Sequence, residues 1–225
     1  MVPIITIDGP SGSGKGTIAR LLADLFGLHC LDSGALYRLV GLATERARVD
    51  PSMVERLVAI ASAMQVEFKD GCVLLDGEDV TLAIRTEQAG NAASRVAAVP
   101  EVRDALLQWQ RNYAREPGLV ADGRDMGTVV FPEAGVKIYL TASPEERARR
   151  RYNQLKEKGL DANLSHLVAE IRERDDRDSN RSVAPLLPAP DALVMESTAL
   201  SIAEVLGQVS SSVLRVYPEL AKKGA

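Results

Sequence analysis

The sequence predicts an α/β fold in which a five-stranded parallel sheet is covered by helices on both faces. Short apolar runs alternate with amphipathic stretches along most of the chain, a pattern that is typical of parallel sheets with crossover helices. A glycine-rich loop joins the first apolar run to the first helical pattern. Between residues 65 and 77 the pattern changes to two-residue alternation around Asp-Gly pairs, which predicts a small antiparallel sheet inserted into the α/β chain.

Each predicted element follows from a local pattern. Strands are expected where short apolar runs end at turn residues, at residues 4–8, which should be buried, and at 28–31, 119–122, 137–141 and 192–194. Helices are expected where apolar residues recur every three or four positions, at residues 15–25, from 36 onward, and at 52–63, 86–98, 101–114, from 143 onward, 164–181 and 201–216.

Two of these helices begin with sequences typical of a capping box. Ser52 is followed three residues later by Glu55, and Ser201 is followed by Glu204. In each case the serine is expected to cap the helix and the glutamate to return a hydrogen bond. The buried stripe of the first helix is expected to consist of Ile18, Leu21, Leu22 and Leu25.

The composition is that of an ordinary folded protein. The 225 residues carry 27 basic and 31 acidic side chains, a formal net charge of −4, and 46% of them are apolar, which excludes wholesale disorder. The mild acidity argues against a protein that coats nucleic acid or an anionic membrane. Of the basic residues, 20 are arginine, whose planar guanidinium suits bidentate phosphate contacts.

The two cysteines, Cys30 and Cys72, are too few for a secreted disulfide framework, and the two histidines complete no zinc-binding spacing. We expect both thiols to be reduced. No secretory leader is recognisable at the start of the sequence, and no apolar run approaches the ~20 residues of a membrane span. We therefore expect a cytoplasmic protein without a membrane partner, and a monomer, because nothing in the sequence requires a dimer.

Residues 9–17 predict a phosphate-binding loop. The glycines allow consecutive backbone N–H groups to surround phosphate oxygens, the helix that follows adds its N-terminal partial charge, and the loop's lysine reaches the β and γ phosphates. The expected nucleotide contacts are Gly9, Pro10, Ser11, Gly12, Ser13, Gly14, Lys15, Gly16 and Thr17. Gly16 replaces the Ser or Thr that usually ligates Mg²⁺, so Thr17 is expected to hold Mg²⁺ largely through water.

Polar residues follow the carboxyl ends of three predicted strands. The phosphate loop follows the first, Asp32-Ser33-Gly34 the second, and 122–125 (Asp-Gly-Arg-Asp) the third. Ligands of such sheets bind beyond the carboxyl ends of the strands, so these clusters are expected to face one crevice. Asp122 could orient waters on Mg²⁺; the alternative is an ordinary turn, with Asp125 as a helix cap.

The predicted helix 164–181 has an inward face that changes from apolar to charged. The face continues from Ile171 to Arg174, Asp175, Asp178 and Arg181. Buried charges are costly unless they are paired or line a wet cleft. Two interpretations are open, an arginine-lined cleft wall and a set of internal salt bridges.

The preceding helix carries several basic residues in its first half, among them Arg147, Arg150 and Arg151. They predict either a solvated basic face or a mobile lid that closes over a transferring phosphate and excludes water. Nucleic-acid binding is a third option, but the acidic charge balance and the lack of an aromatic platform argue against it.

Taken in order, GPSGSGKGT, LDSGALYR, NAASRVAA, ADGRDMGTVVFP and ERDDRDSNRSVAP resemble the bacterial cytidylate kinases of the nucleoside monophosphate kinase family, over almost the whole chain. The resemblance implies a P-loop kinase that uses ATP and Mg²⁺ to phosphorylate CMP and dCMP. It implies a core (1–34, 111–146 and 163–225), a monophosphate-binding lobe (35–110) and a short helical lid (147–162).

The resemblance also implies roles for particular residues. Lys15, Arg124 and Arg174 would stabilise the transferring phosphoryl group, together with Arg147, Arg150 and Arg151 of the lid. The residues that match acceptor-binding positions are Ser33, Arg38, Ser94, Arg103, Arg124, Asp125, Arg174, Asp178 and Arg181. Ser94, Arg103 and Asp125 would recognise cytosine, and Asp178 the sugar hydroxyls. The alanine-rich segment around Ser94 also allows a simple packing role.

Two other functions are weighed against this one. The first is a P-loop kinase for another small acceptor, such as AMP, UMP, shikimate or dephospho-CoA; an insert with Ser94 and Arg103 is not required by a small carbocyclic acceptor. The second is a nucleotide-dependent switch that binds a partner protein. The chain lacks the NKxD motif that reads guanine, which argues against a GTPase.

Overall fold

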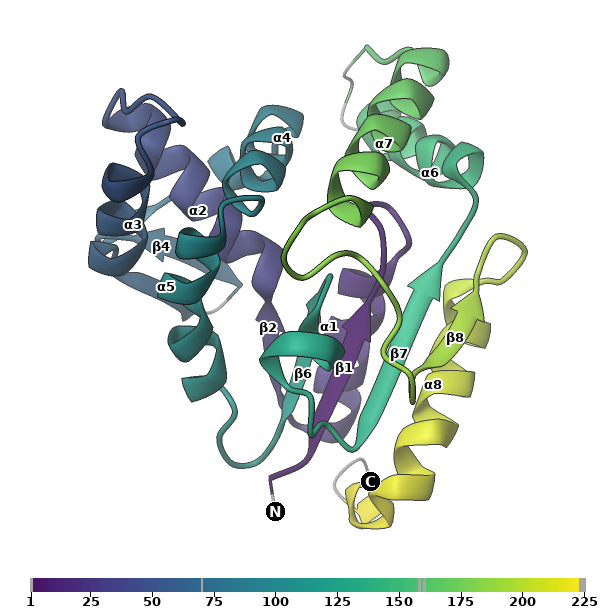
Figure 1. Ribbon diagram of the computed structural model, residues 1–225. Coiled ribbons are helices and arrows are strands. Elements are labelled where there is room, and N and C mark those ends of the chain that lie inside the picture. Colours follow the sequence, from purple (N-terminus) through teal and green to yellow (C-terminus); the bar gives the residue numbers. More distant parts are fainter. Residues whose placement is uncertain (1, 70, 158, 160, 223–225) are drawn as a thin grey trace. The chain divides into compact units, whose positions relative to one another are not determined.

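The computed structural model describes residues 2–69, 71–157, 159 and 161–222. It confirms the predicted five-stranded parallel sheet, whose strand order is β2-β6-β1-β7-β8 (Figure 1). The strands are β1 (Ile4–Asp8), β2 (His29–Asp32), β6 (Leu119–Gly123), β7 (Val136–Thr141) and β8 (Leu193–Glu196). All of them lie within about two residues of the predicted positions.

The chain divides into two compact units. Residues Met1–Asp32 and Tyr113–Ala225 form one, called the core unit here, and Ser33–Asn112 form the other, called the inserted unit. The parallel sheet belongs to the core unit, and each unit contains its own cluster of buried apolar side chains.

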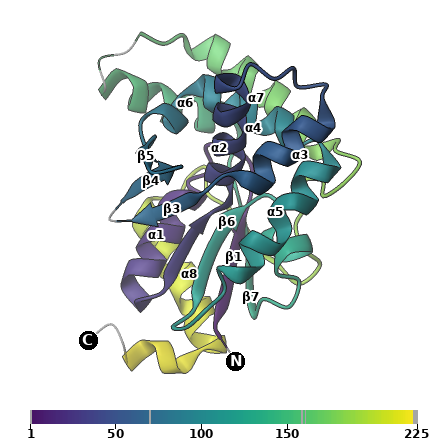
Figure 2. The ribbon, with the colours of Figure 1, turned by 90° about the vertical axis from the view of Figure 1, so that its left-hand side faces the viewer.

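In the core unit, helices α1 (Lys15–Phe26) and α8 (Ile202–Val216) pack on one face of the sheet (Figures 1 and 2). The π-helical turn η2 (Met126–Val130) contacts β1 and lies in front of the sheet in Figure 1, whereas α1 lies behind it. Helices α6 (Pro144–Glu157) and α7 (Leu164–Ser179) pack on each other beyond the carboxyl ends of the strands. A short 3₁₀ helix, η3 (Pro218–Lys222), follows α8.

Helix α1 begins and ends at glycines. Gly14 precedes it, and Gly27 stops it in the left-handed conformation, with φ 62°, which glycine adopts without a steric penalty. Its buried residues are Ile18, Ala19, Leu22, Ala23 and Phe26. The predicted stripe was therefore only half right, because Leu21 and Leu25 are 37% and 42% exposed. The small alanines, not these leucines, face the sheet.

Among its described residues, the inserted unit combines four helices with the predicted antiparallel sheet. Its helices are α2 (Ser33–Arg46), α3 (Val54–Ala63), α4 (Glu87–Val96) and α5 (Pro100–Asn112), with a 3₁₀ turn η1 (Ala83–Arg85). Its strands β3 (Val66–Lys69), β4 (Cys72–Leu75) and β5 (Glu78–Asp79) form the hairpin and the second turn that the alternation predicted. Helices α2 and α4 cross closely, since a Cβ on Gly41 would lie 2.9 Å from that of Ala92.

One of the two predicted capping boxes is wrong. Helix α3 begins at Val54 with Met53 at its N-cap and no side-chain cap. Ser52 instead gives both its N–H and its hydroxyl to Asp50 Oδ1, at 2.8 and 2.7 Å, a local turn that competes with capping. The box at α8 is confirmed, because Ser201 accepts from the Glu204 N–H and Glu204 accepts from the Ser201 N–H.

Candidate functional site

The loop between β1 and α1 has a backbone that requires glycine. Gly9 has φ 152°, and a Cβ there would lie 2.0 Å from the carbonyl oxygen of Leu140. Gly12 has φ 78°, and a Cβ there would lie 3.1 Å from Cβ of Arg147. The loop therefore takes a path that only glycine permits at these positions, and it leads directly into the N-terminus of α1.

Two arginines of α6 donate hydrogen bonds to backbone carbonyls of this loop. Arg147 Nη1 donates to the Ser11 carbonyl at 3.0 Å, and Arg150 Nη1 donates to the Ser13 carbonyl at 3.2 Å. Arg147 is buried, and its Nε donates to the Ala142 carbonyl at 2.8 Å. Helix α6 is thus tied to the phosphate loop through its first two turns.

The other two predicted lid arginines, Arg150 and Arg151, both make contacts within the core unit. Besides its loop contact, Arg150 bonds the Ser197 carbonyl at 2.7 Å and pairs with Glu146 at 3.0 Å. Arg151 Nη1 donates to Gln154 at 3.4 Å, within its own helix. The predicted lid, 147–162, also contains residues 158 and 160, which lie outside the described residues. The lid therefore stays a prediction.

The carboxyl ends of β2, β6 and β1 lie side by side, as the sequence predicted. Asp122 of β6 pairs in register with Asp32 of β2 and with Ile7 of β1. A Cβ on Gly16 would lie 3.7 Å from Asp122 Oδ2, so the Asp122 carboxylate stands beside the loop position that usually carries the Mg²⁺-binding hydroxyl. Asp122 is buried.

This arrangement fits a divalent cation that is bound together with a nucleotide. Carboxylate and hydroxyl oxygens are suitable ligands for Mg²⁺, which usually keeps several waters and binds substrate phosphates. Among the described residues there is no group of three or more His, Cys, Asp and Glu side chains that could hold a metal. A cation at Asp122 and Thr17 would therefore have to complete its coordination with phosphate oxygens and water.

Lys15 lies among charges of both signs. The pKa of Lys15 is lowered to about 7, chiefly by withdrawal from water and also by the positive charges of Arg124 and Arg174, against the opposing effects of Asp122 and Asp32. Its Nζ donates to the Pro10 carbonyl at 3.3 Å. A cluster of positive charge beside a glycine loop favours a polyanion, which would also restore the charged form of the lysine.

Asp178 of α7 lies at the centre of a group of arginines. It is 1% exposed, Arg124 Nε donates to its Oδ2 at 2.8 Å, and Arg181 pairs with its Oδ1. Burial alone would raise the pKa of Asp178, but Arg124, Arg181 and Arg174 outweigh burial and hold this pKa well below its usual range. The carboxylate is charged at neutral pH.

The charged inward face of α7 is confirmed, and its carboxylates Asp175 and Asp178 form ion pairs. Arg147 Nη1 donates to Asp175 Oδ1 at 3.0 Å, Asp178 pairs as described, and Arg174 Nη1 donates to the Ser11 hydroxyl at 3.3 Å. Internal salt bridges, the second of the two interpretations, are therefore present. Arg147 and Arg174 also contact Ser11 of the phosphate loop, so the two interpretations are compatible.

Asp125 is buried and stands at the N-cap position of η2. The alternative in which it caps a helix is wrong, because among the described residues its side chain makes no capping hydrogen bond there. Arg124, the residue before it, is directed toward Asp178. The Gly123–Met126 segment therefore places an arginine and a carboxylate next to one another at the end of β6.

In the inserted unit, Ser33 begins α2, and Ser33, Ser94 and Arg103 are buried. The Arg103 guanidinium lies over the Tyr37 ring, 5.5 Å from its centroid, and donates to the Ala97 carbonyl at 3.3 Å. Arg38 Nε is buried and has no hydrogen-bond partner within the part of the chain that the structure describes. The packing role considered for the Ser94 segment is real, since its alanines pack against α2.

Sequence reasoning missed several residues of this region. Ser197 accepts from Arg150 and donates to the Thr141 carbonyl at 2.9 Å, and Tyr37 carries the Arg103 contact. No local pattern marks either residue. Asp8, at the end of β1, was also missed, although its position before the glycine loop could have drawn attention to it.

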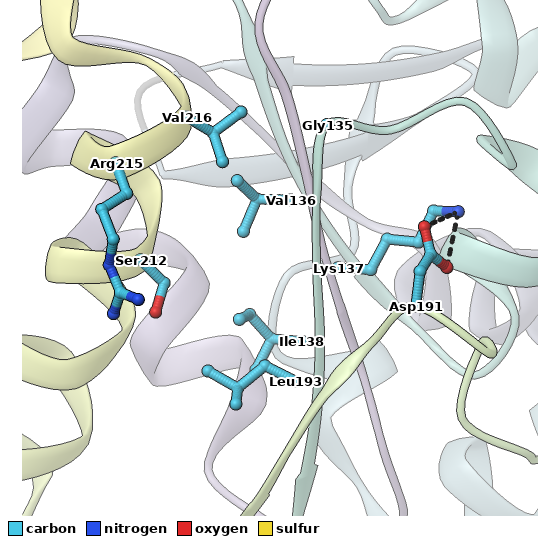
Figure 3. A pocket seen from close by; sticks show the side chains of 9 residues that line it. All are labelled: Gly135, Val136, Lys137, Ile138, Asp191, Leu193, Ser212, Arg215 and Val216. Atoms are coloured by element: carbon cyan, nitrogen blue, oxygen red, sulfur yellow. Dashed lines mark hydrogen bonds and ion pairs between the residues drawn. The ribbon is translucent and has the colours of Figure 1, made fainter.

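One surface pocket lies elsewhere in the core unit (Figure 3). It has a volume of about 330 Å³ and is lined by Gly135, Val136, Lys137, Ile138, Asp191, Leu193, Ser212, Arg215 and Val216. These residues include the beginnings of β7 and β8, the ends of the strands opposite the phosphate loop. Its Lys137 is paired with Asp191 at 2.9 Å. The pocket is therefore separate from the candidate site.

The described residues contain no helix long and apolar enough to cross a membrane.

Comparison with known proteins gives consistent matches. The sequence model of the family described as cytidylate kinase matches residues 5–215 of this chain. A protein named cytidylate kinase from Aeromonas hydrophila is 59% identical over 210 residues, which cover 92% of this chain and 91% of that protein. Another of the same name, from Stutzerimonas stutzeri, is 59% identical over 218 residues, covering 94% and 95%.

A solved structure of an uncharacterised protein from Eubacterium ventriosum is similar in fold. It covers 95% of this chain and 98% of its own, with a TM-score of 0.52 and 12% sequence identity. At this identity the likeness concerns the fold alone.

Proposed function

Because the chain belongs to the cytidylate kinase family, we propose that it transfers the γ-phosphoryl group of ATP to CMP and dCMP, giving CDP and dCDP. The observation that carries the proposal is the surroundings of Lys15, where a glycine loop meets Arg124, Arg174 and Asp122. Such a site is suited to holding phosphates and compensating their charge.

Phosphoryl transfer depends on in-line placement and charge compensation more than on covalent help from the protein. We propose that the backbone of residues 9–17 binds the ATP phosphates, while Lys15, Arg124 and Arg174 compensate the charge that develops on the transferring group. A phosphate oxygen of the acceptor is the nucleophile, and it carries no proton that must be removed at neutral pH. No residue is therefore assigned as general base.

Mg²⁺, when bound with ATP, would add positive charge between the β and γ phosphates. Asp122, beside Gly16, and Thr17, in the first turn of α1, are the residues that would hold it, largely through water. The Asp122 carboxylate also opposes the lowering of the pKa of Lys15, so it keeps the lysine closer to its charged form.

We propose that acceptor recognition uses the residues that match the acceptor-binding positions of the family. Cytosine presents an amino donor and two acceptors at its edge, which a carboxylate and an arginine can complement. Asp125, Ser94 and Arg103 have these chemical types, and Asp178 is a charged acceptor suited to sugar hydroxyls. The full proposed set is Ser33, Arg38, Ser94, Arg103, Arg124, Asp125, Arg174, Asp178 and Arg181.

The remaining assignments are also proposals. A lid over residues 147–162 would exclude water, which could otherwise replace the acceptor. The free thiols of Cys30 and Cys72 suit a reducing compartment, and we place the protein in the cytoplasm with ATP and CMP or dCMP as its partners. We expect it to act as a monomer.

A substrate panel tests the proposed function. Purified protein is incubated with ATP, Mg²⁺ and either CMP, dCMP, UMP or AMP, and diphosphate formation is followed by chromatography. CMP and dCMP are expected to be converted with the highest kcat/KM. Faster conversion of UMP or AMP would contradict the assigned specificity, and ATP consumption without any acceptor would contradict the assigned reaction.

A further inference from the structure

Asp8 is a buried carboxylate that the proposed reaction does not use. It is the last residue of β1, directly before the phosphate loop, and is 4% exposed. Its Oδ1 accepts from the Met126 N–H and its Oδ2 from the Gly127 N–H, both at 2.8 Å. These two hydrogen bonds join β1 to a segment more than 100 residues away in the sequence.

The two donors are the first N–H groups of the π-helical turn η2 (Met126–Val130). The first N–H groups of a helical turn have no partner within it and need an external acceptor. An aspartate at the N-cap position usually supplies that acceptor. Asp125 occupies this position, but its side chain makes no capping hydrogen bond within the described residues. Asp8 supplies the cap from another strand.

This replacement has a consequence for Asp125. If Asp125 capped η2, its carboxylate would be turned back onto the backbone of Gly127 or Thr128. Asp8 already occupies the Gly127 N–H, so this N–H does not compete for the Asp125 carboxylate, whose side chain makes no capping hydrogen bond to the turn within the described residues. The same two bonds also fix where the segment from Gly123 to Gly127 lies against β1.

We infer that Asp8 is a positioning residue for acceptor recognition, which caps η2 in place of Asp125, so that Arg124 is held in place and the Asp125 carboxylate is not turned back onto this helical turn. The inference rests on the proposed function, in which Asp125 recognises cytosine. The inference assigns no substrate contact to Asp8 itself.

The electrostatics of Asp8 support a functional role. The pKa of Asp8 is raised to about 6, chiefly by burial and also by the charge of Asp125, although the Gly127 and Met126 hydrogen bonds and the charge of Lys15 oppose the rise. A second buried carboxylate beside Asp125 is therefore unfavourable for folding, and a neutral cap would be less costly. Unfavourable charges that persist in a fold are typical of functional sites.

The test compares Asp8→Asn with Thr6→Val. Asn keeps the size of Asp but has one acceptor oxygen, and its amide group places a donor against one of the two N–H groups. Thr6 lies two residues earlier in the same strand, is buried, and its hydroxyl has no hydrogen-bond partner among the described residues. Thr6→Val is therefore the matched control. Like Asp8→Asn, it changes the polarity of a buried β1 side chain but keeps its shape, and it leaves the Asp8 cap intact.

In Asp8→Asn, one N–H group of η2 loses its acceptor and is expected to draw the Asp125 carboxylate onto the helical turn. The KM for CMP is expected to rise about tenfold, and the preference for CMP over UMP to fall about tenfold, as for loss of hydrogen bonds to a charged group. The KM for ATP should stay within about twofold, because the backbone of the phosphate loop is retained. Thr6→Val should match the wild type in all three.

Equal losses for ATP and CMP would show a merely structural role and overturn the inference, as would an unchanged CMP KM and pyrimidine preference in Asp8→Asn. If Asp8→Asn fails to fold, Asp8→Ser, which adds no opposing amide donor, takes its place. Failure of both to fold, judged by circular dichroism, also overturns it.

The wild-type reaction separates this inference from the proposed function. If the wild type does not phosphorylate CMP, the proposed function is wrong, whatever the variants do. In that case, the capping by Asp8 is tested in the ligand-free protein by amide hydrogen exchange. Exchange at Met126 and Gly127 should be faster in Asp8→Asn than in Thr6→Val. Equal exchange in the two variants would show that Asp8 does not cap η2.

Discussion

At the scale of single residues, the environment of Lys15 suits the binding of an anionic ligand but is unfavourable for the stability of the ligand-free fold. Its pKa is lowered to about 7 by burial and by Arg124 and Arg174, so the folded protein holds the charged form less readily than water does. Natural proteins accept such costs at sites that bind charged ligands. The cost should disappear when the charge is removed.

Lys15→Met tests this directly. Turnover is expected to fall by at least about a thousandfold, as for the loss of a group that stabilises transition-state charge, while the urea midpoint of unfolding is not lowered. Coupled-enzyme kinetics and urea titration followed by circular dichroism provide the two measurements. A markedly lower midpoint would mean that Lys15 is a packing residue, contrary to our assignment.

The charged form of Asp178, in contrast to that of Lys15, is favoured by folding. Its folded pKa is held below the ordinary 3.8 by Arg124, Arg181 and Arg174, despite burial. An acid of this kind contributes stability that is present above its unfolded pKa and is lost as the pH falls below that value. The contribution of the arginine cluster should therefore weaken only in acid.

We expect Asp178→Asn to cost about 3 kcal/mol of unfolding free energy at pH 7, the scale for breaking a buried ion pair. The difference from wild type should shrink by about 1.4 kcal/mol for each pH unit below pH 4. Urea unfolding at pH 7, 4 and 3 measures it. Asp176→Asn, on an exposed position of the same helix, is the matched control, and a pH-independent difference for Asp178→Asn would contradict the linkage.

At the scale of elements, α6 is attached to the phosphate loop by its arginines. Arg147 bonds the carbonyls of Ser11 and Ala142 and pairs with Asp175 of α7. One side chain therefore joins the loop, the end of β7 and two helices. Arg149, two residues later, is 65% exposed and pairs only within α6 among the interactions described.

Arg147→Gln and Arg149→Gln separate these roles. Arg147→Gln is expected to cost about 3 kcal/mol, because it leaves Asp175 without its buried partner, and to raise the KM for ATP several-fold by loosening the loop. Arg149→Gln should change stability by less than about 0.5 kcal/mol, as exposed pairs do. Thermal unfolding and ATP saturation curves measure both. Equal effects of the two changes would refute the bracing role of Arg147.

At the scale of the whole molecule, the two compact units have separate apolar cores. Leu22 belongs to the cluster of the core unit and Leu39 to that of the inserted unit, and both are fully buried. Units with separate cores can open separately, which amide hydrogen exchange detects.

Leu39→Ala is expected to cost about 2–5 kcal/mol and to accelerate exchange in β3 and β4, while β1 and β6 keep their protection at low denaturant. Leu22→Ala, the matched change in the other cluster, should accelerate exchange in β1 and β6. Native-state exchange monitored by NMR makes the comparison. Uniform acceleration over both units in either variant would show that the molecule opens as one unit.

Much of the fold could be predicted because its patterns are local. The strand at β1, the glycine loop, the hairpin at β3–β4 and the capping box at Ser201 each depend on residues within a few positions of one another. One of the failures has an equally local cause. In a capping box the Ser52 N–H would donate to Glu55. Instead, the N–H and the hydroxyl of Ser52 both donate to Asp50, and Ser52 does not cap α3.

The candidate site was predicted less completely. Parallel strands bring their carboxyl ends to one edge, which is why Asp122 could be placed near the phosphate loop before the structure was known. Helical periodicity likewise placed Asp178 and Arg174 on one face of α7. The contacts of Asp8 with η2 and of Arg150 with Ser197 could not be predicted, because no periodicity links these residues.

The amino-acid sequence alone determined the alternation of strands and helices, the glycines of the phosphate loop and the chemical types available to bind phosphate and cytosine. These properties depend on near neighbours, whose spacing the chain itself sets. Only the tertiary structure decided which charges pair, that Arg124 and Arg181 share Asp178, and that Asp8 rather than Asp125 caps η2. Such choices depend on distances of a few ångströms between residues far apart in the chain, and these distances exist only after the sheet has formed.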